Sequence, residues 1–202
     1  MQKNIKIFVE GIADVKFLSD YINHVISDFT INKETIIDSS GWTNNREKSQ
    51  NQMRQNTDNA GINLVIFDAD NDFEKRKNEL EDWKKSANLS FEVFLFPNDE
   101  EIGALEDLLE KIIVDKNQPI FDCWAGYESC LKTKNIEGRA NALTVPAKKT
   151  KIYGYLEALL GTTQKEKEKI KERERDYKNM EHWNLNSDYL NPLKDFLLKH
   201  MT

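Results

Sequence analysis

Three short acidic motifs are the residues of this 202-residue chain that could carry out chemistry. Glu10-Gly11 follows one apolar run, Asp68 and Asp70 follow a second, and Glu106 lies after a third. Carboxylate oxygens are the donors that Mg²⁺ and Mn²⁺ prefer. A carboxylate crowded by others also gains the proton affinity that general acid or base catalysis needs. The pattern therefore predicts a magnesium or manganese site.

The remaining composition disfavours other kinds of catalytic site. The two cysteines, Cys123 and Cys130, are spaced neither as zinc ligands nor as a redox pair, and we expect them to be buried free thiols. The three histidines are scattered without the spacing of metal ligands. No apolar run reaches the ~18–20 residues of a membrane span, and no signal-peptide pattern opens the sequence. We therefore expect a cytoplasmic protein that does not enter a membrane.

The formal net charge of −6 is distributed unevenly along the chain. Residues 92–115 hold eight acidic residues and one lysine, whereas residues 116–155 hold seven basic and three acidic residues. An acidic segment followed by a basic one suits a metal site beside a phosphate-binding surface, although two solvated faces would give the same composition. The candidates for contacting a phosphate backbone are Arg139, Lys148, Lys149 and Lys151.

Strand and helix patterns alternate four times in the first part of the chain. The expected strands cover residues 5–9, 35–38, 63–67 and 91–96. Helical spacing of apolar residues occurs at 13–26, 73–86 and 102–114, and the polar stretch 44–59 is expected to be a mobile helix or loop. This alternation predicts an α/β fold with a mainly parallel sheet of about four strands flanked by helices.

Only helix patterns remain in the last part of the chain, at 121–132, 148–160, 164–182 and 192–200. We therefore expect an α/β domain over residues 1–118, with an all-helical C-terminal extension over residues 119–202 packed on it. Residues 164–182 are almost all charged, which predicts an exposed helix with little packing; a binding arm is the alternative interpretation.

The acidic motifs fall at the ends of expected strands, where open α/β sheets place their binding sites. Residues two apart in an extended segment point the same way, so Asp68 and Asp70 are expected to converge on one cation. Gly11 would permit a tight turn and the close approach of a ligand, and Asp14 would support that turn as the opening residue of a helix. Asp72 is either a further metal ligand or only a helix cap.

Two other interpretations of the aspartate motif at 68–72 are weaker. An EF-hand calcium loop needs glycine where Phe73 stands, and a helix rather than a strand should precede it. A haloacid-dehalogenase phosphatase motif has threonine or valine in the position of Asp72, and it usually lies on the first strand instead of the third.

The order of these motifs resembles a Toprim domain, the fold shared by topoisomerases, bacterial primases and the overcoming-lysogenisation-defect nucleases. Glu10-Gly11 after the first strand and Asp68-x-Asp70 after the third carry the resemblance, which covers residues 4–115. The stretch 96–109 resembles more narrowly an uncharacterised bacterial family of stand-alone Toprim-like proteins.

The resemblance implies a role for each acidic position. Glu10 matches the general base or acid, Asp68 and Asp70 match the metal-binding pair, and Glu106 is the nearest match to a further metal ligand of the nuclease branch. The chain differs from the proteins it resembles because it lacks a topoisomerase's tyrosine-bearing domain, a primase's zinc-binding domain and the ATPase motif of many of the nucleases.

These features lead to three functional hypotheses. The first is Mg²⁺- or Mn²⁺-dependent phosphodiester hydrolysis or transfer on nucleic acid, by a nuclease or phosphotransferase. The second is a catalytically silent Toprim-like regulatory or binding module that acts with a protein partner. The third is a metal-dependent phosphatase or nucleotide hydrolase. The sequence leaves the substrate, the number of metal ions and the oligomeric state open.

Overall fold

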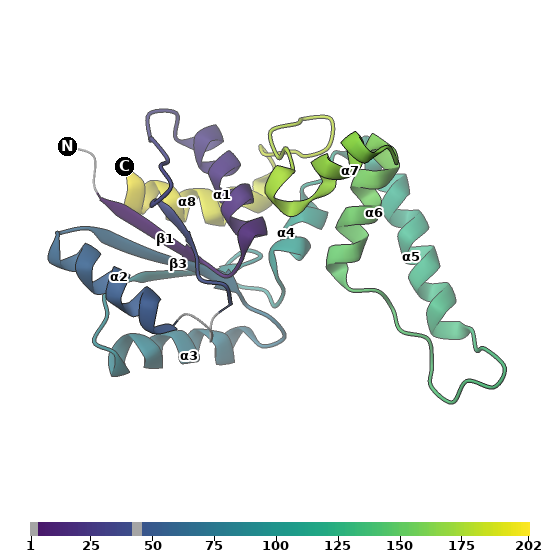
Figure 1. The fold of residues 1–202 in the computed structure, drawn as a ribbon, viewed down its shortest axis with the longest axis horizontal. Coiled ribbons are helices and arrows are strands. Elements are labelled where there is room, and N and C mark those ends of the chain that lie inside the picture. The colour runs from purple at the N-terminus through teal and green to yellow at the C-terminus, as the bar shows by residue number, and fades with distance from the viewer. Residues whose placement is uncertain (1–3, 42–45) are drawn as a thin grey trace.

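The computed structural model of the chain describes residues 4–41 and 46–202 (Figure 1). At its centre lies a four-stranded sheet in the order β2-β1-β3-β4, in which all neighbouring strands are parallel. The strands are β1 (Ile5–Val9), β2 (Ile36–Asp38), β3 (Ile62–Asp68) and β4 (Glu92–Phe96). The prediction of an α/β fold with a parallel sheet flanked by helices is confirmed.

Helices cover both faces of this sheet. On one face lie α1 (Ile12–Val25) and α8 (Asn191–Met201), and on the other lie α2 (Arg46–Asp58) and α3 (Phe73–Ser86) (Figure 1). Ile7 and Ile66 pack into the first layer, whereas Phe8 and Val65 pack into the second. Successive side chains of a strand point to opposite faces, so a strand covered on both sides must be apolar throughout. This burial explains the continuous apolar runs of β1 and β3.

The strand order places a topological switch point between β1 and β3. From β1 the chain passes through α1 to β2 on one side, and it returns through α2 to β3 on the other side of β1. Connections that leave in opposite directions open a crevice at the carboxyl ends of the two strands. Glu10 follows β1 and Asp68 ends β3, so both stand at this crevice.

The helical C-terminal part shares one hydrophobic core with the sheet. The core that contains Phe94 of β4 also contains Ile152 of α6 (Lys148–Leu160) and Leu193 of α8. The ring centroid of Phe196 on α8 lies 5.5 Å from that of Phe94. The boundary expected at residue 118 therefore does not divide the core. Across the described ranges, no helix is long and apolar enough to cross a membrane.

Residues 164–182 differ from the exposed helix expected there. The helix α7 covers only Gln164–Ile170 and is followed by a short 3₁₀ turn at Glu172–Glu174. Ile170 and Tyr177 are buried, and the Tyr177 ring lies 5.3 Å from that of Phe17 on α1. The segment is therefore packed against the core through its few apolar residues.

Residues 118–160, which we call the α5–α6 arm, form two helices whose connecting loop projects from the body (Figure 1). Its first helix, α5 (Gln118–Thr133), buries only Phe121. Cys123 and Cys130 on this helix are free, as expected, but they are exposed, so the prediction of buried thiols is wrong. Because α5 packs mainly on α6, most of its surface faces outward.

Candidate functional site

Four carboxylates gather at the carboxyl ends of β1 and β3, and we call Glu10, Asp14, Asp68 and Glu106 the carboxylate cluster. Asp14 lies in the first turn of α1, and Glu106 in the first turn of α4 (Leu105–Lys111). Asp14 is buried, and the other three are half-buried. Burial, together with the charges of Glu10 and Glu106, raises the pKa of both aspartates, so the four groups lie within electrostatic reach of each other. The structure thus brings together residues from all three predicted motifs.

Asp68 is the most perturbed member of the cluster. Burial, helped by the charges of Asp14, Glu10 and Glu106, raises its pKa to about 9. Its Oδ1 accepts a hydrogen bond of 3.0 Å from the backbone N–H of Leu105, which lowers the pKa but does not offset the burial. Without a positive partner a buried carboxyl group favours its protonated form. The site therefore holds carboxylates whose ionisation a bound cation would favour.

Asp14 has both a structural role and a place in the cluster. Its Oδ2 accepts a hydrogen bond of 2.9 Å from the backbone N–H of Gly11, which satisfies a free donor at the start of α1. Burial is the main cause that raises its pKa to about 7. Asp14 supports the turn as predicted, and it also faces the carboxylates of the cluster.

Gly11 is not required by the turn itself. Its backbone has φ −154° and ψ 177°, an extended conformation that any residue can adopt. A Cβ atom added there would have its nearest neighbour, Asp14 Oδ2, at 3.9 Å, which is an ordinary contact. The conformation at this position therefore does not require glycine, and the close approach of a ligand stays a prediction.

Asp70 does not join Asp68 in the cluster. Its φ of +56° lies in the left-handed region, and its backbone N–H donates a hydrogen bond of 2.8 Å to the carbonyl of Gly103. The side chain is consequently turned outward and 60% exposed. Residues two apart point the same way only while the strand stays extended. The expected convergence of Asp68 and Asp70 is not found, because the chain leaves the strand between them.

Arg76, a residue that the sequence analysis missed, lies between Glu10 and Asp70. Its Nη2 donates a hydrogen bond to Glu10 Oε1 and lies 3.3 Å from Asp70 Oδ2. Its Nε donates a hydrogen bond of 3.0 Å to the backbone carbonyl of Asp68. Burial raises the pKa of Glu10 above its usual value, while the positive charge of Arg76 acts in the opposite direction. Arg76 therefore supplies the positive charge nearest to the predicted catalytic base.

The spacing of α3 contains a signal that could have found this residue. The apolar residues Phe73, Leu80 and Trp83 mark the inner side of the helix. Position 76 falls between them at helical spacing, so Arg76 had to face inward. A basic residue on the buried side of a helix next to an aspartate motif indicates an internal ion pair.

Asp72 acts as the cap of α3. Its Oδ1 accepts a hydrogen bond of 3.0 Å from the backbone N–H of Lys75. Asp72 was predicted to be either a metal ligand or a helix cap, and the structure shows the helix cap. Asp72 also lines a cavity of about 180 Å³, together with Asp70, Arg76 and Glu79. This cavity lies on the Arg76 side of the site.

The basic residues predicted to contact phosphate are mostly engaged with carboxylates. The pairs are Lys148–Asp107, Lys149–Glu172 and Lys151–Glu110. Asp107 and Glu110 of the acidic segment, together with Glu172, thus neutralise these lysines where α6 packs against α4 and the segment after α7. Arg139 lies in the exposed loop of the arm, where its Nε donates a hydrogen bond of 3.0 Å to the carbonyl of Asn141.

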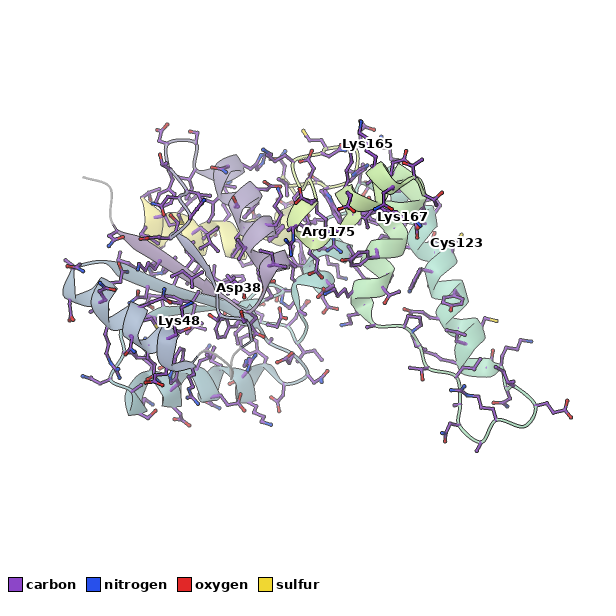
Figure 2. The ribbon with its side chains drawn as sticks, viewed as in Figure 1. Asp38, Lys48, Cys123, Lys165, Lys167 and Arg175 are labelled. Carbon is purple, nitrogen blue, oxygen red and sulfur yellow. The ribbon has the colours of Figure 1, made fainter. Side chains whose placement is uncertain are left out.

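The segment after α7, which contains Arg175 and Tyr177, lies close enough to the carboxylate cluster to be affected by its charges. Burial raises the pKa of Tyr177 to about 12, with a contribution from the charges of Asp14 and Glu106. Arg175 is buried between α7 and α1 (Figure 2), and its guanidinium lies 4.7 Å from the ring centroid of Tyr153. It lowers the pKa of Tyr177, but within the described chain its Nη2 and the Tyr177 hydroxyl lack hydrogen-bond partners of good geometry.

The cluster fits a hard divalent cation in its chemistry. Its donors are all carboxylate oxygens, and burial together with the neighbouring carboxylates raises the pKa of Asp68, an effect that a bound cation would oppose. As they stand, however, no three His, Cys, Asp or Glu side chains among residues 4–41 and 46–202 meet in a geometry that could hold one ion. The residues fit Mg²⁺ or Mn²⁺ in kind, and their side chains would have to move to share one ion.

Comparison with known proteins places the chain in a family without an assigned activity. A family model described as "Protein of unknown function (DUF3226)" matches residues 4–202, so the chain belongs to this family. No curated protein and no solved structure gives a significant match to the chain.

Proposed function

We propose that this protein carries out metal-dependent hydrolysis or transfer of phosphodiesters in nucleic acid at the carboxylate cluster. The observation that supports this most is Asp68, a carboxylate at the switch point of a parallel sheet whose pKa is raised to about 9. Asp68 and Glu106 would hold Mg²⁺ or Mn²⁺. Asp70, which is turned outward, and Asp72, which caps α3, would have to reorient to join them. Once bound, the ion would neutralise phosphate charge and lower the pKa of a water molecule.

The chain's own residues would position and move the proton of the reaction. Glu10 is half-buried at the end of β1, and burial raises its pKa toward the range where a carboxylate can act as a general base or acid. The Toprim resemblance supports the same assignment, since Glu10-Gly11 precedes Asp68-x-Asp70 in the order that this domain has. Asp14 would hold the turn that fixes the backbone next to Glu10.

A polynucleotide suits the site better than a small phosphate ester because of the arm. The last turn of α5 and the loop that follows it expose Lys132, Lys134 and Arg139 and a single acidic residue, Glu137. Lysine and arginine contacts to the phosphate backbone dominate non-specific affinity for nucleic acid. We assign backbone contacts to this loop, and the ion-paired lysines Lys148, Lys149 and Lys151 would contribute only after losing their partners.

The direct test is cleavage of single- and double-stranded DNA and RNA by the full chain, with Mg²⁺ or Mn²⁺ and with a chelator. We expect metal-dependent cleavage that is lost in Asp68→Ala and in Glu10→Ala. Asp82→Ala, at an exposed position of α3, is the matched control and should remain active. Equal activity of the wild type and the two site variants would contradict the proposal. Phosphomonoesters assayed in parallel test the phosphatase alternative.

A catalytically silent module that acts with a partner protein is the second candidate. Two observations favour it: Arg76 already pairs with Glu10 and Asp70, and the α5–α6 arm leaves most of α5 exposed. Stable co-purification with another protein, without cleavage of any nucleic acid in the panel, would support this candidate over the enzyme.

A further inference from the structure

The outer edge of β2 is a feature of the fold that the proposed function does not use. In the order β2-β1-β3-β4 this strand has a neighbour only on the β1 side. A cavity of about 700 Å³, which we call the edge groove, lies along the open side, and Ile36, Ile37 and Asp38 of the strand line it. We propose that the edge groove binds an extended peptide segment of a partner protein, which pairs with β2 as a further strand of the sheet.

The backbone of β2 presents unpaired hydrogen-bonding groups to the edge groove. Thr35 and Ser39, which flank the strand, hydrogen-bond through their backbone to β1. Alternate residues of a parallel strand turn their N–H and C=O groups to opposite sides, so those of Ile36 and Asp38 point away from β1. Within the described residues none of these outward groups has a hydrogen-bond partner. Such a row of free donors and acceptors is a template for the pairing of another strand.

The walls of the edge groove come from the helices on the two faces of the sheet. On one face α1 contributes Ile12 and Val15, and Ile12 is 39% exposed. On the other face α2 contributes four amide side chains, those of Gln52, Gln55, Asn56 and Asn59. Amide groups both donate and accept hydrogen bonds, which matches the alternating polar groups of a peptide backbone. The edge groove therefore suits an extended main chain, with Ile12 as an apolar contact for one of its side chains.

Charges at the two ends of the edge groove define the chemistry and the direction of the peptide. Lys6 on β1 and Lys33 lie at the amino end of β2, and Asp38 lies at its carboxyl end. None of these three side chains has an ion-pair partner in the described ranges. Glu34 also lines the lysine end, which keeps a net positive charge. Complementary charge predicts a peptide with an acidic carboxyl-terminal end at the lysines and a basic residue at Asp38. Such a peptide runs antiparallel to β2.

The inference is independent of the metal site. The edge groove shares no lining residue with the carboxylate cluster, and its contacts need no bound ion. It supplies the chemistry of a partner for the full chain, whether or not the chain cleaves nucleic acid.

The test is selection of binders to the full chain from a display library of short random peptides with free carboxyl termini. Fluorescence anisotropy then measures the affinity of the enriched peptides for the wild type and its variants. We expect enriched peptides with acidic carboxyl-terminal ends and a basic residue nearer the amino terminus.

Two substitutions at one position separate strand pairing from charge. Asp38→Asn removes the charge and keeps an acceptor for the N–H of Ser40. Asp38→Pro removes the same charge and also the outward N–H, a change that an edge strand tolerates. We expect Asp38→Pro to bind the selected peptides about tenfold more weakly than Asp38→Asn, because a peptide carbonyl loses its donor. Thermal unfolding shows whether both variants are folded.

Substitutions outside β2 test the wall and the charges, and they decide the question if Asp38→Pro does not fold. Gln55→Trp fills the edge groove and should weaken binding at least about tenfold, whereas Asn51→Trp, at an exposed position of α2 outside the groove, should not. Lys33→Glu should weaken binding several-fold more than Lys48→Glu, the same charge change at an exposed position of α2.

The outcomes separate a peptide partner from other uses of this edge. Peptides that lose affinity in Gln55→Trp and Asp38→Pro, with Asn51→Trp near the wild type, support the proposal. A library without binding peptides, or peptides whose affinity these variants leave unchanged, overturns it. Self-association in sedimentation experiments that Asp38→Pro abolishes would assign the edge to a second copy of the chain and overturn the peptide partner. None of these measurements depends on metal binding or cleavage, so the proposed function stands or fails separately.

Discussion

The guanidinium of Arg76 donates a hydrogen bond to the carboxylate of Glu10, although the two residues lie 66 positions apart in the chain. The bond joins the end of β1 to the first turns of α3, and the same guanidinium reaches Asp70. The acidic site is therefore not a set of independent carboxylates. Its geometry depends on a buried arginine that any account of metal binding has to include.

The stability of the metal-free protein should depend on pH through Asp68. The pKa of Asp68 rises on folding from 3.8 to about 9, so the folded protein binds this proton more tightly than the unfolded chain does. The resulting stabilisation of the folded state is complete below about pH 4 and is lost as the pH rises toward 9. We expect the free energy of unfolding in chelator to fall between pH 5 and pH 9 by at least about 1.4 kcal/mol, the equivalent of one pKa unit. Denaturant melts at several pH values measure it.

Asp68→Asn is the control for this pH dependence. An amide keeps the shape of the side chain and the acceptor for the Leu105 N–H, but it does not titrate. Its unfolding free energy should fall less over the same pH range, and the remaining slope should come mainly from Asp14, whose pKa is raised to about 7. If the unfolding free energies of the wild type and Asp68→Asn changed in parallel with pH, the raised pKa of Asp68 would be contradicted.

Two glycines near the site should respond differently to alanine. Gly103 has φ +141°, and a Cβ added there would lie 2.6 Å from Asp107 Oδ2, so Gly103→Ala should cost about 1–3 kcal/mol of stability. Gly11→Ala meets neither problem and should remain within about 0.5 kcal/mol of the wild type. Chemical denaturation compares the two, and equal losses would show that the turn at Gly11 is more constrained than its backbone indicates.

Two buried tyrosines provide a similar matched pair. The Tyr155 hydroxyl donates a hydrogen bond of 2.7 Å to the carbonyl of His182 and accepts one of 3.0 Å from Asn117. Tyr155→Phe removes both of these hydrogen bonds and should cost about 1–3 kcal/mol. Asn117 would still donate to the carbonyl of Glu181, and the carbonyl of His182 would still accept from the N–H of Val114. Tyr177→Phe removes a hydroxyl without a well-formed hydrogen bond in the described chain and should be neutral or stabilising. A large loss in Tyr177→Phe would mean that this hydroxyl has a partner in solution.

Lys151 should stabilise the packing of α6 on α4. Its Nζ lies 2.7 Å from Glu110 Oε2 and 4.9 Å from the ring centroid of Phe121, and its side chain is only 15% exposed. Lys151→Met should therefore cost about 1 kcal/mol. Lys148→Met, in a pair whose lysine is 58% exposed, should cost less. The opposite ranking in unfolding experiments would contradict the assignment of Lys151 to the interface.

The fold can be predicted from local patterns of apolar residues in the sequence, whereas the geometry of the site can be predicted from them only in part. The apolar runs of β1 and β3 and the helical spacing of α1 predict the parallel sheet, because burial on two faces leaves a clear signature in sequence. The same reasoning places Glu10 and Asp68 at one edge. It does not anticipate the left-handed residue at Asp70, since one backbone angle changes the direction of a side chain without altering the hydrophobic pattern.

Long-range partners account for the remaining differences. Residues 164–182 suggested a solvated helix because charges dominate the segment, yet Ile170 and Tyr177 bind it to the core. The lysines of α6 suggested a phosphate surface, but Lys148 and Lys151 pair with carboxylates of α4. In both cases the contact that determines the position of the side chains comes from a segment distant in sequence. The composition of the segment itself cannot predict such a contact.

The central claim, that the carboxylate cluster binds a divalent ion, is tested most directly by calorimetric titration of the metal-free protein with Mn²⁺. We expect binding by the wild type that weakens at least about tenfold in Asp68→Asn, because the substitution removes a charged oxygen ligand. Asp82→Asn, an exposed change on α3, should bind as the wild type does. A wild type that does not bind Mn²⁺, or an Asp68→Asn variant that binds it equally well, would contradict the claim.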